Sequence, residues 1–219
     1  PQGLVDVHRI FAGQEVLSIA NQDPYMRSHP LSRDRIRAAQ AFVATYGDTS
    51  SPNPQADYWF ARLRGKLSAF TRSPKWSLRR AKEESHRDIR LMREAIAHHR
   101  RRNLQQALRA INGALAIRPK DAFYHDLKGQ ILLQSRQFQS AVPAYRTAAK
   151  IAPRDSLILG NLGRALLTVD RPKEALTYLE DSRNRDFRNM RVLRDLGSAY
   201  AQVGNNGMAS LSTAERYAL

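Results

Sequence analysis

The fold is decided by the stretch from Gly129 to Gly163, which reads GQILLQSRQFQSAVPAYRTAAKIAPRDSLILGNLG. Its two ends are 34 residues apart, and the second half of the chain repeats this spacing. The recurring residues are small side chains and helix-ending prolines, namely Ala107, Ala141, Ala175 and Ala209, Gly129, Gly163 and Gly197, and Pro119 and Pro153. A period of this length is typical of repeats that each consist of two antiparallel helices.

Packing explains why these residue types recur. Glycine and alanine let the two backbones of a pair approach closely, and large residues such as Leu166 and Leu179 fill the space around that contact. Proline stops the second helix because it cannot continue the hydrogen-bond ladder. The sequence therefore predicts an all-α fold, an α-α superhelix of helix pairs. The expected pairs are 88–100 with 104–117, 122–135 with 138–151, 156–168 with 172–184, and 190–203 with 206–217.

The pattern resembles the tetratricopeptide (TPR) repeat family. Leu162-Gly163 and Leu196-Gly197 match the Leu-Gly pair of that family. The resemblance covers 88–219 and implies about four repeats, of which the first and the last are degenerate. In the first repeat, for example, Glu94-Ala95 stand in place of Leu-Gly.

The residues before the repeats are also expected to be helical. An apolar stripe over about 3–19 predicts one helix, and a second runs from Ser32 to Tyr46 in a segment comprising 1–46. The stretch 47–87 is expected to be a helical linker. It contains a helix over about 55–71 and a basic helix that begins at Ser73-Pro74.

The charge is strongly unbalanced, with 36 Lys and Arg against 20 Asp and Glu, a net charge of +16. Fifteen basic and four acidic residues lie between Arg62 and Arg109. Such a field attracts nucleic acid, anionic lipid or acidic proteins. The alternative interpretation is a set of arginine-rich helix faces that simply contact solvent.

No motif in the chain predicts catalysis by the chain itself. Cysteine is absent, which excludes disulfides and thiol chemistry. None of the six histidines has the spacing of a His-Glu-x-x-His zinc helix, and no glycine-rich phosphate loop is present. We therefore expect no catalytic residue and no cofactor in this chain.

The segment Asp23-Pro-Tyr-Met-Arg-Ser-His-Pro-Leu-Ser-Arg-Asp-Arg-Ile36 carries a second resemblance. It is similar to the stretch that follows the catalytic core in TPR-containing zinc metallopeptidases of the bacterial envelope. This resemblance implies that the chain is the non-catalytic C-terminal part of such an enzyme, whose zinc-binding helix it lacks. It also implies a periplasmic location and a role for His29 as a zinc ligand in the intact parent only. A local hydrogen-bonding role for His29 is the alternative.

The leading functional prediction is a protein-interaction module that recruits substrates of a metallopeptidase in envelope protein quality control. TPR stacks curve, and the inner helices line a groove that holds a peptide or a partner helix. The residues predicted to line this groove are Arg90, Arg93, Tyr124, Lys128, Ile131, Asn161, Ala165, Arg194 and Ser198. The expected partners are acidic peptides or unfolded envelope proteins. The alternative is a stand-alone basic TPR adaptor that binds acidic peptides, anionic lipid or nucleic acid. The sequence leaves the oligomeric state open.

Overall fold

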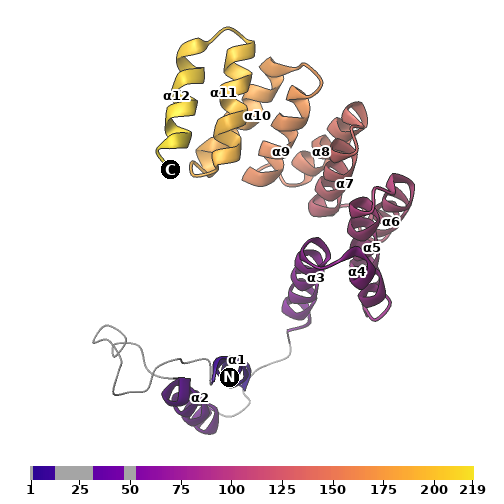
Figure 1. The fold of residues 1–219 in the computed structure, drawn as a ribbon, viewed down its shortest axis with the longest axis vertical. Helices are drawn as coiled ribbons and strands as arrows, with labels where there is room; N and C mark the ends of the chain where they lie inside the picture. Colours follow the sequence, from indigo (N-terminus) through magenta and orange to yellow (C-terminus); the bar gives the residue numbers. More distant parts are fainter. Residues whose placement is uncertain (1, 13–31, 47–52) are drawn as a thin grey trace. The chain divides into compact units, whose positions relative to one another are not determined.

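The computed structural model describes residues 2–12, 32–46 and 53–219. Within these ranges the secondary structure is entirely helical (Figure 1). The twelve helices of the described residues are α1 (Gln2–Phe11), α2 (Ser32–Tyr46), α3 (Pro54–Thr71), α4 (Pro74–Ala81), α5 (Arg87–Arg100), α6 (Leu104–Ile117), α7 (Ala122–Gln134), α8 (Phe138–Ile151), α9 (Ser156–Leu167), α10 (Pro172–Arg185), α11 (Met190–Gln202) and α12 (Asn206–Tyr217). The predicted all-α fold class is confirmed.

The chain divides into two compact units, Pro1–Pro54 and Gln55–Leu219. In the first unit α1 packs against α2, and Val5 and Ala39 are the buried apolar residues of this pair. The predicted helix over 32–46 has the bounds that the sequence indicated. The His29 prediction lies outside the described residues.

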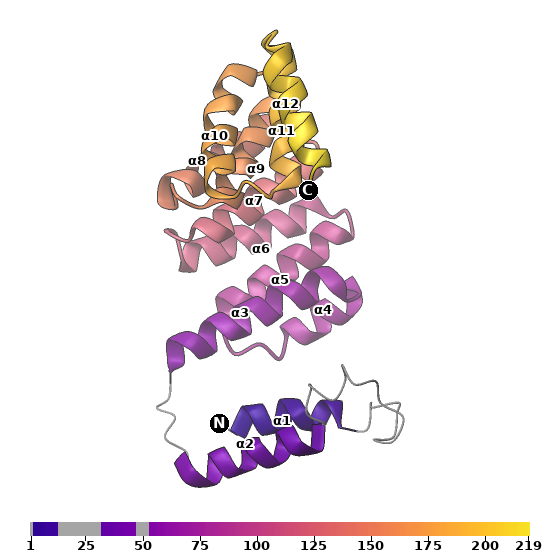
Figure 2. The ribbon, with the colours of Figure 1, turned by 90° about the vertical axis from the view of Figure 1, so that its left-hand side faces the viewer.

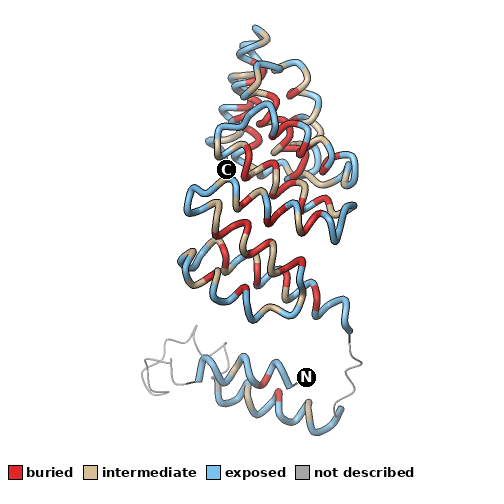
Figure 3. The backbone as a smooth tube through the Cα atoms, turned by 90° about the vertical axis from the view of Figure 1, so that its right-hand side faces the viewer, coloured by how far each residue is buried: buried red, intermediate tan, exposed pale blue. Residues whose placement is uncertain are grey.

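In the second unit α5 to α12 stack as four antiparallel pairs (Figures 1 and 2). Each helix boundary lies within two residues of the bound expected from the 34-residue period. We refer to the first helix of each pair, which is α5, α7, α9 or α11, as an A helix, and to the second as a B helix. The buried residues run through the interior of this stack (Figure 3).

The recurring small residues make the close helix contacts that the sequence predicted. A Cβ atom added at Gly163 would lie 2.5 Å from Cγ of Leu179, and one added at Gly129 would lie 2.8 Å from the ring of Tyr145. Both glycines are on A helices, and both contacts are to the B helix of the same pair. Any side chain at these two positions would push the paired helices apart.

The turn inside each pair repeats with the same period. Its central residue has a positive φ, at Arg102, Arg136, Asp170 and Gly204. The amide of the following residue donates to a carbonyl five positions earlier, as in the Schellman motif that ends many helices. The four bonds are Asn103 N to His98 O, Gln137 N to Leu132 O, Arg171 N to Leu166 O and Asn205 N to Tyr200 O. Three of the four turns thus adopt a left-handed conformation without glycine.

Helices α3 and α4, expected within a linker, belong to the same unit as the repeats. Ser73 caps α4 by accepting a hydrogen bond from the amide of Trp76, and α4 packs against α5. Helix α3 packs against α5 around Gly65, where an added Cβ atom would lie 3.0 Å from Ile89. The buried apolar core at this end therefore includes Tyr58 and Ala69 of α3 together with residues of α5, α6 and α7.

Candidate functional site

Arg62 of α3 forms one of the buried connections between α3 and the repeat array. Its side chain is only 5% exposed, and its guanidinium forms two hydrogen bonds with the carboxylate of Asp121, of 2.5 and 2.7 Å. The guanidinium lies 4.0 Å from the ring centre of Tyr124 and 4.9 Å from that of Trp59. Burial by itself would lower the pKa of Arg62, but the hydrogen bond to Asp121 and the electrostatic interactions with Tyr124, Asp121 and Tyr58 together outweigh burial, so the pKa lies above its usual value. Arg62 is therefore a buried cation that lies over the rings of Trp59 and Tyr124.

Asp88 of α5 forms a second buried connection between the same elements. Its Oδ2 accepts hydrogen bonds from the hydroxyls of Tyr58 at 2.6 Å and Tyr124 at 3.0 Å, and from Nε of Arg118 at 2.8 Å. Burial alone would raise the pKa of Asp88, but these bonds and the charge of Arg118 outweigh burial and hold the pKa below its usual value. One ionised carboxylate thus joins α3, α5, α7 and the end of α6.

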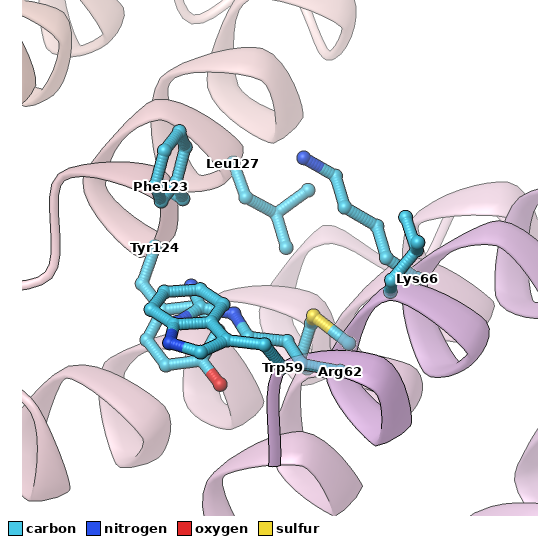
Figure 4. A pocket seen from close by; sticks show the side chains of 8 residues that line it. Trp59, Arg62, Lys66, Phe123, Tyr124 and Leu127 are labelled. Carbon is cyan, nitrogen blue, oxygen red and sulfur yellow. The ribbon is translucent and has the colours of Figure 1, made fainter. Parts of the chain in front are cut away.

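Beside Arg62 lies an open apolar cavity, the aromatic pocket, with a volume of about 190 Å³ (Figure 4). Its walls come from α3, α5 and α7, and its lining includes Trp59, Leu63, Lys66, Phe123, Tyr124 and Leu127. Trp59 is 43% exposed, Phe123 42% and Leu63 65%, so large apolar surfaces here face solvent. Figure 4 shows Lys66 and Leu127 on the opposite side of the pocket from Trp59.

A second cavity, the arginine pocket, lies between α9 and the start of α11 and has a volume of about 420 Å³. Its lining includes Leu157, Asn161, Arg164, Arg188, Arg191 and Asp195. Three arginines and one aspartate give this lining a net charge of +2. Within the described part of the chain, neither Arg188 nor Arg191 forms an ion pair with a carboxylate, and Nη2 of Arg164 is buried without a hydrogen-bond partner.

Polar contacts connect the A helices between the two pockets. Nδ2 of Asn161 on α9 donates to Asp126 on α7 at 2.9 Å, and Nε of Arg164 donates to Asp195 on α11 at 2.9 Å. Burial raises the pKa of Asp126, and the bond from Asn161 offsets only part of that effect. Because these bonds join successive A helices, the face that carries both pockets is held in one arrangement.

Some of the predicted groove residues lie on this face. Asn161 lines the arginine pocket and is half-buried, whereas Arg194 and Ser198 of α11 are exposed and line a neighbouring cavity. Arg194 also donates to Asp195 at 2.8 Å. Arg90 and Lys128 are half-buried, and neither lines one of the two pockets.

Four predicted groove residues are buried instead, namely Arg93, Tyr124, Ile131 and Ala165. Tyr124 contributes to the wall of the aromatic pocket, but its hydroxyl is bound to Asp88. Arg93 lies under α3, where it donates to the hydroxyl of Ser68 and pairs with Glu84. Arg93, Ile131 and Ala165 line neither pocket and belong to the packed interior of the stack. A shift of one residue along a helix rotates a side chain by about 100°, which separates the open face from the core.

Several exposed positions that were not predicted follow the same 34-residue spacing. Phe123 on α7, Leu157 on α9 and Arg191 on α11 are 34 residues apart, and all three are exposed. Leu127, Asn161 and Asp195 form a second row at the same spacing; Asn161 was predicted, and Leu127 and Asp195 are buried although each lines one of the pockets. Trp59, Leu63 and Lys66 had no comparable signal, because α3 lies outside the periodic region.

The described residues contain no group of three or more His, Asp or Glu side chains arranged to hold a metal ion. None of the described helices combines the length and the apolar character that crossing a bilayer requires.

Comparison with known proteins supports the interpretation of the second unit. Residues 132–205 match the family model described as tetratricopeptide repeat. This stretch is similar in sequence to tetratricopeptide repeats. The match covers α8 to α11 in full, together with the end of α7, and therefore includes the arginine pocket between α9 and α11.

Solved structures of MamA proteins share the TPR fold of this chain. MamA from Desulfovibrio magneticus RS-1, starting at its residue 41, aligns with a TM-score of 0.62 at 20% identity, over 77% of this chain and 97% of that chain. A double mutant named MamA RS-1 ArsTM aligns with a TM-score of 0.61 at 19% identity, over 76% of this chain and 95% of that chain. MamA AMB-1 aligns with a TM-score of 0.58 at 17% identity, over 75% of this chain and 92% of that chain. At these identities the similarity concerns the fold alone.

No curated protein matches the chain. The family match and these structural matches support a TPR protein, and neither provides a link to a peptidase.

Proposed function

We propose that the TPR unit is a protein-interaction module that binds an acidic segment of a partner protein along its A-helix face. The observation that carries this proposal is the arginine pocket, whose lining has two guanidinium groups without a carboxylate partner among the described residues. Arginine binds carboxylates through two parallel hydrogen bonds, so an aspartate, a glutamate or a C-terminal carboxylate suits this lining.

The polar contacts between the A helices support this interpretation. Asp195 is already engaged by Arg164 and Arg194, so it does not neutralise Arg188 and Arg191. Leu157 is 61% exposed on the same wall and offers an apolar contact beside the arginines. Charged hydrogen bonds next to apolar surface are typical of peptide recognition on a rigid helical face.

The test uses a fluorescein-labelled peptide rich in Glu and Asp, compared with the same peptide carrying Gln and Asn. Binding to the full chain is measured by fluorescence anisotropy at fixed salt. The double substitution Arg188→Gln with Arg191→Gln should weaken binding of the acidic peptide by about tenfold or more, since each charge-assisted bond contributes about 1 kcal/mol or more. A matched control, Arg109→Gln with Arg136→Gln, removes the same charge from a B helix and a turn and should change binding less than twofold.

Equal losses in the two double variants would show non-specific charge attraction and would contradict the proposal. Equal binding of the acidic and the amide peptide would contradict it as well. A duplex DNA probe and vesicles containing phosphatidylserine address the other partners that a basic surface suits. Tighter binding of either probe than of the acidic peptide, with a steep loss on adding salt, would replace the proposal.

A more specific proposal is that this module serves a zinc metallopeptidase of the bacterial periplasm. It rests on the sequence Asp23–Ile36, including His29, which lies outside the described residues. The test is the activity and zinc content of the intact parent protein with His29→Ala. An unchanged zinc content and an unchanged activity would count against a role for His29 at zinc.

A further inference from the structure

The aromatic pocket is a second candidate contact point, formed where α3 lies against α5 and α7. It is separate from the arginine pocket, and the two share no lining residue. Three large apolar side chains, Trp59, Leu63 and Phe123, expose surface at this point. Exposed apolar residues gathered around a cavity indicate an interaction site more strongly than the same residues scattered singly.

We infer that this pocket takes one large apolar side chain from the acidic segment of the partner, and that Lys66 pairs with a carboxylate next to that side chain. The inference rests on the proposed function, because it concerns the same partner. It adds an apolar requirement that the arginine pocket by itself does not impose.

The size of the pocket favours a single side chain over a free small molecule. Its volume of about 190 Å³ is below the ~300–1,000 Å³ of typical small-molecule sites. One inserted aromatic or leucine side chain would be buried against the walls formed by Trp59, Phe123 and Leu127. Burial of such a side chain stabilises a complex by about 1.5–3 kcal/mol.

The part of the wall formed by Arg62 and Tyr124 is already fixed in the unbound protein. Arg62 is held by Asp121 and lies against the rings of Trp59 and Tyr124, while Tyr124 donates to Asp88. A partner therefore does not have to order these groups, and little conformational entropy is lost on binding. Trp, Tyr and Arg around a well-packed pocket are also the residue types that dominate binding energy at protein interfaces.

The charge of the pocket favours an acidic neighbour for the inserted side chain. The lining contains two cations, Arg62 and Lys66, and no carboxylate. Asp121 neutralises Arg62, which leaves the ammonium of Lys66 at the edge. Asp126 already accepts a hydrogen bond from Asn161. Burial raises the pKa of Asp126, and the charge of Lys66 offsets only part of this effect. An aspartate or glutamate beside the anchor residue suits this arrangement.

The test compares two fluorescein-labelled acidic peptides that differ only in one central residue, Trp or Ala. The full chain should bind the Trp peptide about tenfold more tightly, as expected for burial of one aromatic side chain. Leu63→Ala and Phe123→Ala should each reduce this ratio toward one while leaving the affinity for the Ala peptide within twofold. Phe138→Ala removes an exposed phenylalanine from α8 and should leave the ratio unchanged.

Equal affinities of the two peptides for the unmodified chain would overturn the inference and leave the proposed function intact. A preference for Trp that survives both Leu63→Ala and Phe123→Ala would also overturn it, because the tryptophan would then bind elsewhere. Failure of both peptides to bind would remove the proposed function and this inference with it. Circular dichroism of each variant shows whether the helical fold is retained.

Discussion

The second unit contains two regions that reach the same helical stacking by different means. From α5 to α12 the contacts repeat every 34 residues, with small residues between paired helices and a left-handed turn in each pair. At the N-terminal end α3 is attached by buried charges and tyrosine hydroxyls around Asp88, Arg62 and Asp121. The periodic contacts within each helix pair are made by small and large side chains, whereas α3 adds buried polar pairs to its packing around Gly65.

The largest expected effect is the loss of the polar attachment. Asp88→Asn removes the charge that accepts bonds from Tyr58, Tyr124 and Arg118, and it leaves buried donors poorly matched. The free energy of unfolding should fall by about 2–4 kcal/mol, as for other buried charged networks that lose one partner. Urea denaturation followed by circular dichroism measures this change.

Asp195→Asn is the matched control in the repeats, because Asp195 is also buried and bound by arginines. Arg194 is half exposed, so water replaces much of that interaction, and the expected loss is about 1 kcal/mol. If the two substitutions cost the same, the attachment of α3 would be no more dependent on charge than the repeats are.

The next effect tests how closely the helices pack in the repeats and at α3. Gly163→Ala places a methyl group 2.5 Å from Cγ of Leu179 and 3.3 Å from the carbonyl oxygen of Ala175. Overpacking of this kind should destabilise the protein by about 1–3 kcal/mol even though alanine favours helix. Thermal unfolding gives the comparison with the unmodified chain.

Gly65→Ala is the counterpart on α3. Its added methyl group would meet Ile89 at 3.0 Å and the side chains of Arg93 and Met92 at 3.3 Å, with no backbone atom among the nearest contacts. These side chains can shift, and the helix propensity gain of about 1 kcal/mol offsets the crowding. A stability within about 1 kcal/mol of the unmodified chain is expected. A larger loss than that of Gly163→Ala would mean that α3 is packed more rigidly than the repeats.

A smaller effect concerns the dependence of stability on pH. The pKa of Asp126 is raised from 3.8 by burial, so the unfolded chain releases this proton at a lower pH than the folded chain does. Stability therefore falls as pH rises from the unfolded value through the folded pKa. Asp126→Asn should remove that fall and make the protein more stable near pH 7 by about 1 kcal/mol, while its amide oxygen still accepts from Asn161.

The pKa of Asp88 is shifted in the opposite direction, so Asp88 serves as the comparison. The pKa of Asp88 is lowered from 3.8 in the folded chain. The ionised carboxylate therefore stabilises the folded state above pH 3.8, and this stabilisation is lost as pH falls through the folded pKa. Urea midpoints of the unmodified chain and the two Asn variants, measured between about pH 3 and pH 7, separate the two carboxylates. Parallel pH profiles for Asp126→Asn and the unmodified chain would contradict the assignment to Asp126.

The smallest effect lies in the turns. Arg136 is exposed and has a φ of 59°, a conformation that disfavours any residue with a Cβ atom. Arg136→Gly should raise the free energy of unfolding by about 0.5 kcal/mol, because relief of the strain exceeds the added chain entropy. Gly204→Ala, at a φ of 80°, should lower it by about 1 kcal/mol. Changes of opposite sign in the free energy of unfolding of the two variants would confirm the role of the left-handed turn.

Much of the fold was predictable from the sequence because the same pattern of small residues recurs in each repeat. Alanine and glycine at 34-residue spacing gave the helix pairs and their bounds, and Ser73-Pro74 gave the start of α4. The candidate site was less predictable. Asn161, Arg194 and Ser198 lie at least partly on open surface, but Ile131 and Ala165 face the core, because the repeat pattern alone does not separate the open side of an A helix from its packed side.

The sequence by itself determined the all-α class, the four helix pairs and the positive charge, since these depend on local spacing and composition. Only the tertiary structure decided that α3 belongs to the array, that its Trp59 lies against Phe123 of α7, and that Lys66 lines the same pocket. The physical reason is separation along the chain. Arg62 and Asp121 are 59 positions apart, and no repeat relates them, so nothing local in either segment indicates that the two charges form a buried pair. Arg62 of that pair also lines the aromatic pocket.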